Sequence, residues 1–140
     1  MSMEDVIRMK QVEHVHNEKN ILKSISHPFL ISLISSSMDT RFLYLIFPYV
    51  PGGELFSYLQ SMRRFPSSTA QFYTSEIVSV LGYLHSLNII YRDIKLENLL
   101  LDREGHLKIV DFGFSKQVRD KNAALPSILL WRSYSTWGTA

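Results

Sequence analysis

A polar loop, an apolar hairpin and a short acidic motif follow one another in this chain and constrain its fold more than any other feature. Residues 91–98 read Tyr-Arg-Asp-Ile-Lys-Leu-Glu-Asn, and residues 111–113 read Asp-Phe-Gly. Between them, residues 99–110 form two short apolar runs around a Glu-Gly turn, which is typical of a β-hairpin. Because a hairpin returns the chain to the end where it began, we expect Asn98 and Asp111 to lie close together.

The residue types at this spacing suit phosphoryl transfer. Magnesium prefers hard oxygen ligands in a strict geometry, so the Asp111 carboxylate and the Asn98 amide oxygen suit a nucleotide-bound ion. Asp93 is of the right type to accept the proton of an incoming hydroxyl group. The alternative interpretation, unrelated loop aspartates beside a turn, requires every part of a long pattern to coincide.

Composition indicates one ordinary globular core. The chain has 140 residues, 46% of them apolar, and its formal net charge is +2 from 15 basic and 13 acidic residues. Such a small charge does not favour nucleic acid or an acidic membrane as a partner. The chain has no cysteine, no secretory signal and no apolar run of transmembrane length, so we expect a cytoplasmic or nuclear location.

Hydrophobic periodicity predicts the order of elements in the first third of the chain. Apolar residues at helical spacing predict one helix or a bent pair of helices over residues 4–24, ending before His27-Pro28. Residues 29–36 and 42–50 are rich in Ile, Leu, Phe and Tyr, which predicts an antiparallel strand pair.

Two helices are predicted after the break at residues 51–53. The first is short and covers residues 54–62. The second covers residues 68–87, and Ser68 with Gln71 three residues later forms a capping-box pattern at its start. One face of the second helix carries large apolar residues that we expect to form core. These residues are Tyr73, Ile77, Val80, Leu81 and Leu84.

Motifs at several separated positions resemble the eukaryotic protein kinases. They are His-Val-His-Asn-Glu-Lys at 14–19, Phe-Leu-Tyr at 42–44, Tyr-Val-Pro-Gly-Gly-Glu-Leu-Phe at 49–56 and Asp-Phe-Gly-Phe at 111–114. A tyrosine, Tyr91, also replaces the commoner histidine before Arg-Asp. Within the family, these motifs resemble the group of the cAMP-dependent protein kinase catalytic subunits and their X-linked relative.

The resemblance implies an α+β fold that is a partial protein-kinase-like fold. Its parts are a small-lobe helix and strand pair, a hinge, and the start of the helical large lobe through the Asp-Phe-Gly motif. We expect a partial kinase domain at residues 1–119 and an unmatched C-terminal tail at residues 120–140. The sequence contains no Gly-x-Gly-x-x-Gly loop. We find no match to the family's strand lysine, activation segment or remaining large lobe.

The resemblance also implies roles for the residues of the loop and the acidic motif. Asp93 and Lys95 are the candidate catalytic residues, with Lys95 steadying the transferred phosphoryl group. Asn98 and Asp111 are the candidate ligands of Mg²⁺. Leu96 stands where the family usually has proline, a change that loosens the loop without removing a catalytic group.

Nucleotide binding is implied for residues around a hinge that would hold the adenine of ATP. Phe47 would lie beside the adenine pocket, Leu100 beneath the ring, and the backbone groups of Pro48 and Val50 would bind adenine. Pro48 replaces the usual acidic residue, but its carbonyl is still an acceptor. Two carboxylates are the remaining candidates for cofactor binding, Glu18 and Glu54. Of these, Glu18 resembles the helix carboxylate that pairs with a phosphate-anchoring lysine.

The implied protein substrates carry arginines before the target serine or threonine. Glu54 and Glu97 resemble the carboxylates that bind those arginines. His14 and Arg92 resemble the basic pair that binds a phosphate of the activation segment. Regulatory subunits that bind cAMP are the partners that this resemblance suggests.

The matches and departures together leave two classes of function open. The first is an ATP-dependent serine/threonine kinase of the cAMP-dependent type. In that case we expect these 140 residues to be inactive on their own. The second is a non-catalytic truncated isoform that acts as a binding or regulatory module, or a non-functional fragment. A third interpretation, an unrelated nucleotide-binding α+β protein, needs another phosphate-binding loop, and the sequence offers none.

Overall fold

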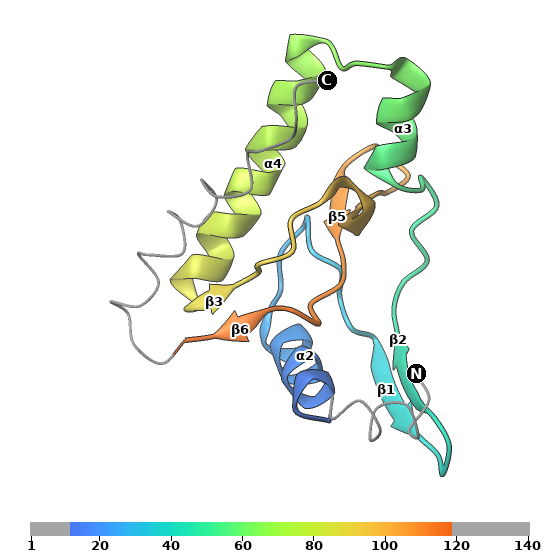
Figure 1. The fold of residues 1–140 in the computed structure, drawn as a ribbon, viewed down its shortest axis with the longest axis vertical. Coiled ribbons are helices and arrows are strands. Elements are labelled where there is room, and N and C mark those ends of the chain that lie inside the picture. The colour runs from blue at the N-terminus through green and yellow to red at the C-terminus, as the bar shows by residue number, and fades with distance from the viewer. Residues whose placement is uncertain (1–11, 119–140) are drawn as a thin grey trace, which may run out of the picture.

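The computed structural model describes residues 12–118 and shows helices beside three separate pairs of antiparallel strands (Figure 1). The helices are α2 (Val12–Ser24), α3 (Leu55–Met62), α4 (Ser67–Ser86) and the 3₁₀ helix η1 (Leu96–Asn98). The strands are β1 (Ser35–Met38), β2 (Leu43–Ile46), β3 (Ile89–Ile90), β4 (Leu99–Leu101), β5 (Leu107–Ile109) and β6 (Lys116–Gln117). They pair as β1 with β2, β3 with β6, and β4 with β5. The predicted α+β class is confirmed.

The predicted hairpin forms at β4 and β5. Leu99 pairs with Ile109 and Leu101 with Leu107, and the apolar strands bury these four side chains. The turn is closed by Asp102, whose Oδ1 accepts hydrogen bonds from the backbone N–H groups of residues 104 and 106 at 2.9 and 3.0 Å. The open end of the hairpin therefore brings residues 98 and 110 together.

The first strand of the predicted pair begins later than its apolar pattern suggested. β1 starts at Ser35, and residues 29–31 run instead beside β5, where Ile31 N–H donates to Ile109 O at 3.1 Å. Ile109 N–H donates in turn to Phe29 O at 2.9 Å. Leu30 and Ile31 are buried in the core, so this apolar run packs against the hairpin rather than against β2. The expected strand over 29–36 is therefore wrong in its first six residues.

The long helix also begins differently from the prediction. Pro66 occupies the N-cap position, and no side chain forms a capping hydrogen bond there. Proline suits the start of a helix because its fixed φ is already helical and it has no N–H to satisfy. Ser68 thus lies inside the first turn, and the predicted capping box with Gln71 is wrong.

The apolar stripe of α4 is largely buried, as predicted. Tyr73, Val80 and Leu84 are buried, and Ile77 and Leu81 pack against the same core as partly buried residues. Tyr91 and Phe112 lie in this core with ring centroids 5.2 Å apart in an edge-to-face arrangement. The core therefore joins α4 directly to the segments that carry the candidate site.

The N-terminal helix is anchored to the Asp-Phe-Gly segment. The side-chain amide of Asn17 on α2 donates to Ser115 O at 2.6 Å. Ile21 and Leu22 of the same helix are buried in the common core. The predicted start of this helix, residues 4–11, and the predicted tail, residues 120–140, lie outside the described residues. Within residues 12–118, no helix is long and apolar enough to cross a membrane.

Candidate nucleotide and phosphoryl-transfer site

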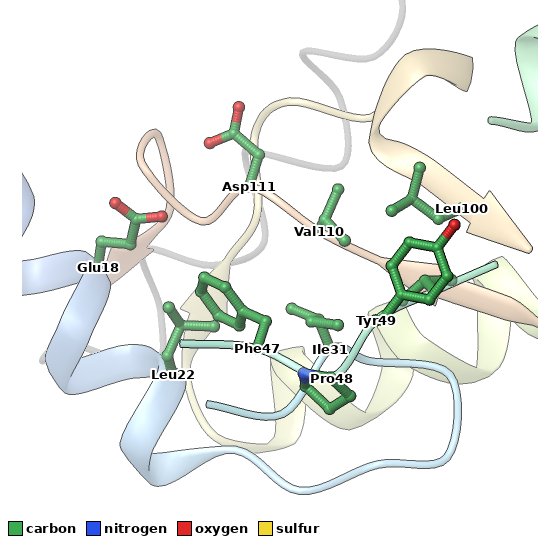
Figure 2. Close-up of a pocket in the computed structure, with 10 residues that line it drawn as sticks. Glu18, Leu22, Ile31, Phe47, Pro48, Tyr49, Leu100, Val110 and Asp111 are labelled. Carbon is green, nitrogen blue, oxygen red and sulfur yellow. The ribbon is translucent and has the colours of Figure 1, made fainter. Parts of the chain in front are cut away.

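A cavity of about 680 Å³ lies between α2, the segment after β2 and the β4–β5 hairpin (Figure 2). Its lining is mostly apolar, with two carboxylates, Glu18 and Asp111, together at one end and Tyr49 at the other. The lining residues are Glu18, Leu22, Ile31, Phe47, Pro48, Tyr49, Val50, Leu100, Val110 and Asp111. A mostly apolar wall with a polar end fits a flat heterocycle joined to a charged group.

The segment after β2 is held to the hairpin through its glycines. Gly52 N–H donates to Leu101 O at 2.8 Å, and Leu101 N–H donates to Gly53 O at 2.9 Å. A Cβ on Gly52 would lie only 2.4 Å from Leu101 O, so any larger residue would push the two segments apart. This close approach places Leu100 on the wall of the cavity near Tyr49.

The catalytic-loop candidates form one hydrogen-bonded group. Lys95 Nζ lies 2.9 Å from Asp93 Oδ2. The Asn98 amide donates to the same Oδ2 at 2.8 Å and to Asp93 O at 3.1 Å. The hydrogen bond to the Asp93 carboxylate raises the pKa of Lys95, so the lysine is firmly cationic. Asp93 is thus oriented by two donors from its own loop.

Two residues of the site have left-handed backbone conformations. Arg92 has φ 68° and Asp111 has φ 61°. Such angles are uncommon for residues other than glycine and persist where surrounding contacts determine them. Here Arg92 Nε donates to Phe114 O at 2.7 Å, and Tyr91 OH donates to Val110 O. These two contacts fasten the catalytic loop to the Asp-Phe-Gly segment.

The donor set at the open end of the hairpin fits a magnesium ion. The side-chain amide nitrogen of Asn98 donates to Asp93. The hydrogen bond from Val110 N–H to the backbone oxygen of Asn98 at 3.0 Å keeps Asn98 beside Asp111. The Asn98 amide oxygen and the exposed Asp111 carboxylate are the hard donors that Mg²⁺ prefers. Residues 12–118 contain no cluster of three or more His, Cys, Asp or Glu residues suited to a metal. Two protein ligands suit an ion that also takes oxygens from phosphates.

Glu18 lies in an environment that disfavours its charge. Burial and, next, the Asp111 carboxylate raise its pKa, although a hydrogen bond from the Phe112 backbone acts in the opposite direction. Among the described residues, no lysine or arginine forms an ion pair with Glu18. Within residues 12–118, the Glu18 carboxylate therefore has no compensating cation.

We expect Glu18→Gln to raise the melting temperature of this chain at neutral pH. Folding raises the pKa of the Glu18 carboxyl, so protonation of this group favours the folded state. This contribution is complete below the unfolded pKa and is lost as pH rises through the folded pKa. The difference between variant and parent should therefore shrink as the pH falls toward about 4.3. Circular dichroism melts across this range measure it.

The matched control is Glu13→Gln, on an exposed residue in the first turn of the same helix. This change should give no gain, because a carboxylate near a helix N-terminus is already favourable. An equal gain in both variants would contradict the assignment of the effect to the cavity.

The other predicted residues lie outside this cavity lining. Glu54 and Glu97 are exposed, and the Glu54 carboxylate does not cap α3 although it stands at the N-cap position. His14 is exposed on α2, and within residues 12–118 its imidazole makes no hydrogen bond or ion pair. Arg92 is also exposed but bonds to Phe114 O rather than to a partner on α2.

Sequence reasoning missed four residues of the cavity wall. Leu22, Ile31, Tyr49 and Val110 line it but were not predicted as binding residues. Tyr49 lies between two predicted hinge residues, so its position could have indicated this role. Ile31 and Val110 were assigned to strands, where apolar residues are expected to pack in a core and carry no separate binding signal.

Comparison with known proteins agrees with this geometry. The family model described as the protein kinase domain matches residues 1–136. The chain belongs to the protein kinase family. It is 58% identical to the human (Homo sapiens) cAMP-dependent protein kinase catalytic subunit PRKX over 125 residues. It is 59% identical to the cAMP-dependent protein kinase catalytic subunit 3 of Drosophila melanogaster, also over 125 residues. The cAMP-dependent protein kinase catalytic subunit of Dictyostelium discoideum is 52% identical over 120 residues.

These matches cover most of the chain but a minor part of each relative. The two alignments of 125 residues take in 89% of this chain, and the third takes in 86%. They correspond to 35%, 21% and 18% of the respective relatives. The chain thus spans about a third or less of the length of these kinases. The fold is a partial kinase fold, as the sequence predicted.

Proposed function

We propose that these residues are the nucleotide-facing and catalytic-loop part of a serine/threonine kinase that transfers the γ-phosphoryl group of ATP. One observation carries the proposal: Asp93, Asn98 and Asp111 meet beside a largely apolar cavity. Asn98 connects the three. Its side-chain amide donates to Asp93, and its backbone carbonyl accepts from the N–H of Val110, the residue before Asp111. The identity to cAMP-dependent protein kinase catalytic subunits over 125 residues supports the same class of reaction.

In this proposal each polar side chain has one task. The Asp93 carboxylate accepts the proton of the substrate hydroxyl group, and Lys95 beside it contributes positive charge near the transferred group. Asn98 and Asp111 would hold Mg²⁺, which neutralises charge on the phosphate oxygens when it is bound. Phe47, Pro48, Val50 and Leu100 would bind adenine within the cavity.

The preferred protein substrates in this proposal carry arginines before the target serine or threonine. Glu54 and Glu97 are exposed, and the Glu54 carboxylate is not engaged in capping α3. Carboxylates in this state can form bidentate pairs with guanidinium groups. Regulatory subunits that bind cAMP are the further partners we propose, and the cytoplasm or nucleus the location.

These 140 residues alone are proposed to be inactive. Glu18 has no cationic partner among the described residues, and the sequence contains no glycine-rich phosphate loop. The phosphate tail of ATP would therefore meet two carboxylates without a compensating lysine. The alternative function is a non-catalytic module that engages kinase partners, which the exposed apolar side chains of β1 and β2 favour. These side chains are Met38, Tyr44 and Ile46.

A radiolabel transfer assay with a serine peptide preceded by arginines tests this proposal. The 140-residue chain is expected to give no incorporation above background. The same residues within a chain as long as the relatives are expected to incorporate label, and failure of that longer chain would refute the proposed reaction. Incorporation by the short chain that depends on Asp93 would refute its proposed inactivity.

Thermal shift measures how much of the nucleotide site these residues provide. A ligand stabilises the folded state by RT ln(1 + [L]/Kd), so millimolar Mg-ATP should raise the melting temperature little if binding is weak. We expect weak binding because Asp111 and Asn98 supply the only proposed metal ligands. A rise of many degrees that Asp111→Ala abolishes would show that the cavity binds nucleotide well without further residues.

A further inference from the structure

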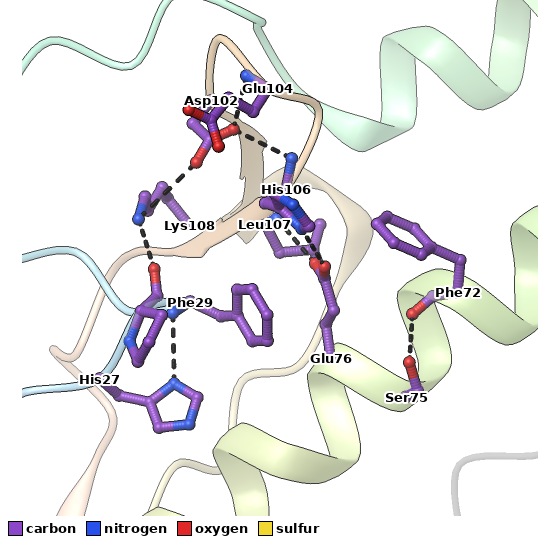
Figure 3. A network of polar contacts seen from close by, with 11 residues as sticks. His27, Phe29, Phe72, Ser75, Glu76, Asp102, Glu104, His106, Leu107 and Lys108 are labelled. Carbon is purple, nitrogen blue, oxygen red and sulfur yellow. Dashed lines mark hydrogen bonds and ion pairs between the residues drawn. The ribbon is translucent and has the colours of Figure 1, made fainter.

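One buried acidic side chain lies away from the candidate site. Glu76 on α4 is 4% exposed. A buried carboxylate is costly unless hydrogen bonds compensate its charge, and both oxygens of Glu76 have partners (Figure 3). Oε1 lies 2.5 Å from Nδ1 of His106, and Oε2 accepts a hydrogen bond from Leu107 N–H at 2.9 Å. Glu76 thus contacts two consecutive residues where the hairpin turn meets β5.

The imidazole of His106 is held in place by aromatic neighbours as well as by Glu76. The Phe29 ring stacks on it with a centroid distance of 5.6 Å, and the Phe72 ring lies at 5.5 Å. Phe29 comes from the segment beside β5, and Phe72 comes from α4 one turn before Glu76. Three segments that are distant in the sequence therefore meet at this one ring.

The charged groups around His106 are mostly acidic. Glu76 faces it from α4, and Asp102 and Glu104 face it from the hairpin turn. Lys108 on β5 lies 3.8 Å from Asp102 and donates to Pro28 O, so its charge is directed to the other side of the turn. Two further titratable side chains lie nearby. His27 contacts the ring of Phe29, and Tyr73 on α4 is close enough to Glu76 for an electrostatic interaction.

We propose that Glu76 is a positioning residue, whose carboxylate holds the turn end of the β4–β5 hairpin against α4 through Leu107 N–H and the His106 imidazole. The other end of this hairpin carries Asn98 and Asp111. The two strands are only three residues each, so fixing the turn end restricts the angle of the end that carries the proposed ligands. The role in positioning those ligands rests on the proposed function, whereas the contact between α4 and the hairpin does not.

This arrangement makes the attachment of the hairpin depend on pH. The Glu76 carboxylate raises the pKa of His106 in the folded chain, with smaller contributions from Asp102 and Glu104. The charge-assisted contact is therefore complete below the unfolded pKa of about 6.5. It is lost as pH rises through the higher, folded pKa, leaving the hydrogen bond to Leu107 N–H.

Titration of the histidine Cε1–H signals by NMR in the 140-residue chain tests the proposal. Glu76→Gln keeps an acceptor for Leu107 N–H but removes the charge, so the pKa of His106 should fall toward about 6.5. His106→Asn identifies the signal among the five histidines. Glu104→Gln is the matched control, because it removes an exposed charge from the same turn and should lower that pKa less.

Amide hydrogen exchange of residues 99–110 gives the second measurement. After correction for intrinsic rates, the hairpin of Glu76→Gln should exchange faster than the parent below about pH 6, where His106 is protonated in the parent. The difference should disappear at alkaline pH. A purely steric role for Glu76 predicts a difference that does not depend on pH.

Two outcomes would overturn the proposal. The first is a pKa of His106 that does not change in Glu76→Gln, and the second is a common titration of all five histidines, which would show that the contact does not form. Neither measurement uses nucleotide or substrate. A failure of the proposed kinase reaction is therefore distinguishable from a failure of this inference.

Discussion

Replacing Asp93 with Asn in a chain as long as the relatives should lower phosphoryl transfer to an arginine-preceded serine peptide by about 10²- to 10⁴-fold. Asp93 Oδ2 already accepts hydrogen bonds from Lys95 and from the Asn98 amide. An asparagine would turn its amide oxygen to these two donors and its NH₂ group to the incoming hydroxyl. The hydroxyl would then face a donor in place of a proton acceptor, while the proposed nucleotide cavity stays unchanged.

The loss should therefore appear in kcat more than in the KM for ATP. Asp102→Asn is the matched control, because Asp102 belongs to the hairpin turn and an amide oxygen can still accept from the N–H groups of residues 104 and 106. We expect that variant to retain the parent rate within a few fold. Parent-like turnover of Asp93→Asn would show that another group accepts the proton.

The parts of the site that sequence predicted are those specified by local pattern. The hairpin between Asn98 and Asp111 needs only two short apolar runs and a turn, and it forms as expected. The same locality explains the success with α3 and α4, whose apolar residues recur at helical spacing. A short-range pattern sufficed to predict these elements, because it fixes where each begins and which face is apolar, although their packing partners lie elsewhere in the chain.

Two features that the sequence did not reveal have partners far away in the sequence. Residues 29–31 read as part of a strand pair, but their backbone groups bond to Ile109, about eighty positions further on. The contact of Glu76 with His106 joins residues 30 apart, and nothing in either local pattern marks it. From helical periodicity alone, we would expect an apolar residue where Glu76 stands on the apolar face of α4. The structure instead shows a carboxylate with both oxygens engaged.

The left-handed conformations of Arg92 and Asp111 were equally invisible to sequence reasoning. Glycine is the residue that signals a positive φ, and neither position carries one. The conformations are imposed by contacts between the catalytic loop and the Asp-Phe-Gly segment, such as the Arg92 bond to Phe114 O. The sequence predicted which side chains form the candidate site, whereas their orientation depends on this tertiary contact.

The isolated 140-residue chain should be a marginally stable, aggregation-prone monomer that binds a hydrophobic dye. Several large apolar side chains remain in solvent, including Ile34 at 63%, Met38 at 65% and Val78 at 62% exposure. Burying such a side chain contributes about 1.5 to 3 kcal/mol, so several of them together forgo a stabilisation comparable with the roughly 5 to 15 kcal/mol of a whole domain. The apolar stripe of α4 does not add to this exposed surface, because Tyr73 and Leu84 are buried.

Two substitutions on α4 separate exposed apolar surface from core packing. Val78→Lys removes an exposed apolar side chain and places a better helix former there, so dye binding and aggregation should fall while the melting temperature holds or rises. Val80→Lys, two residues further on, buries a charge at a fully buried position and should abolish the cooperative transition. Dye fluorescence, light scattering and thermal melts of the two variants beside the parent make the comparison. A sharp cooperative melt of a monomeric parent that binds no dye would contradict this expectation, because the exposed side chains would then have to be covered by other residues of the chain.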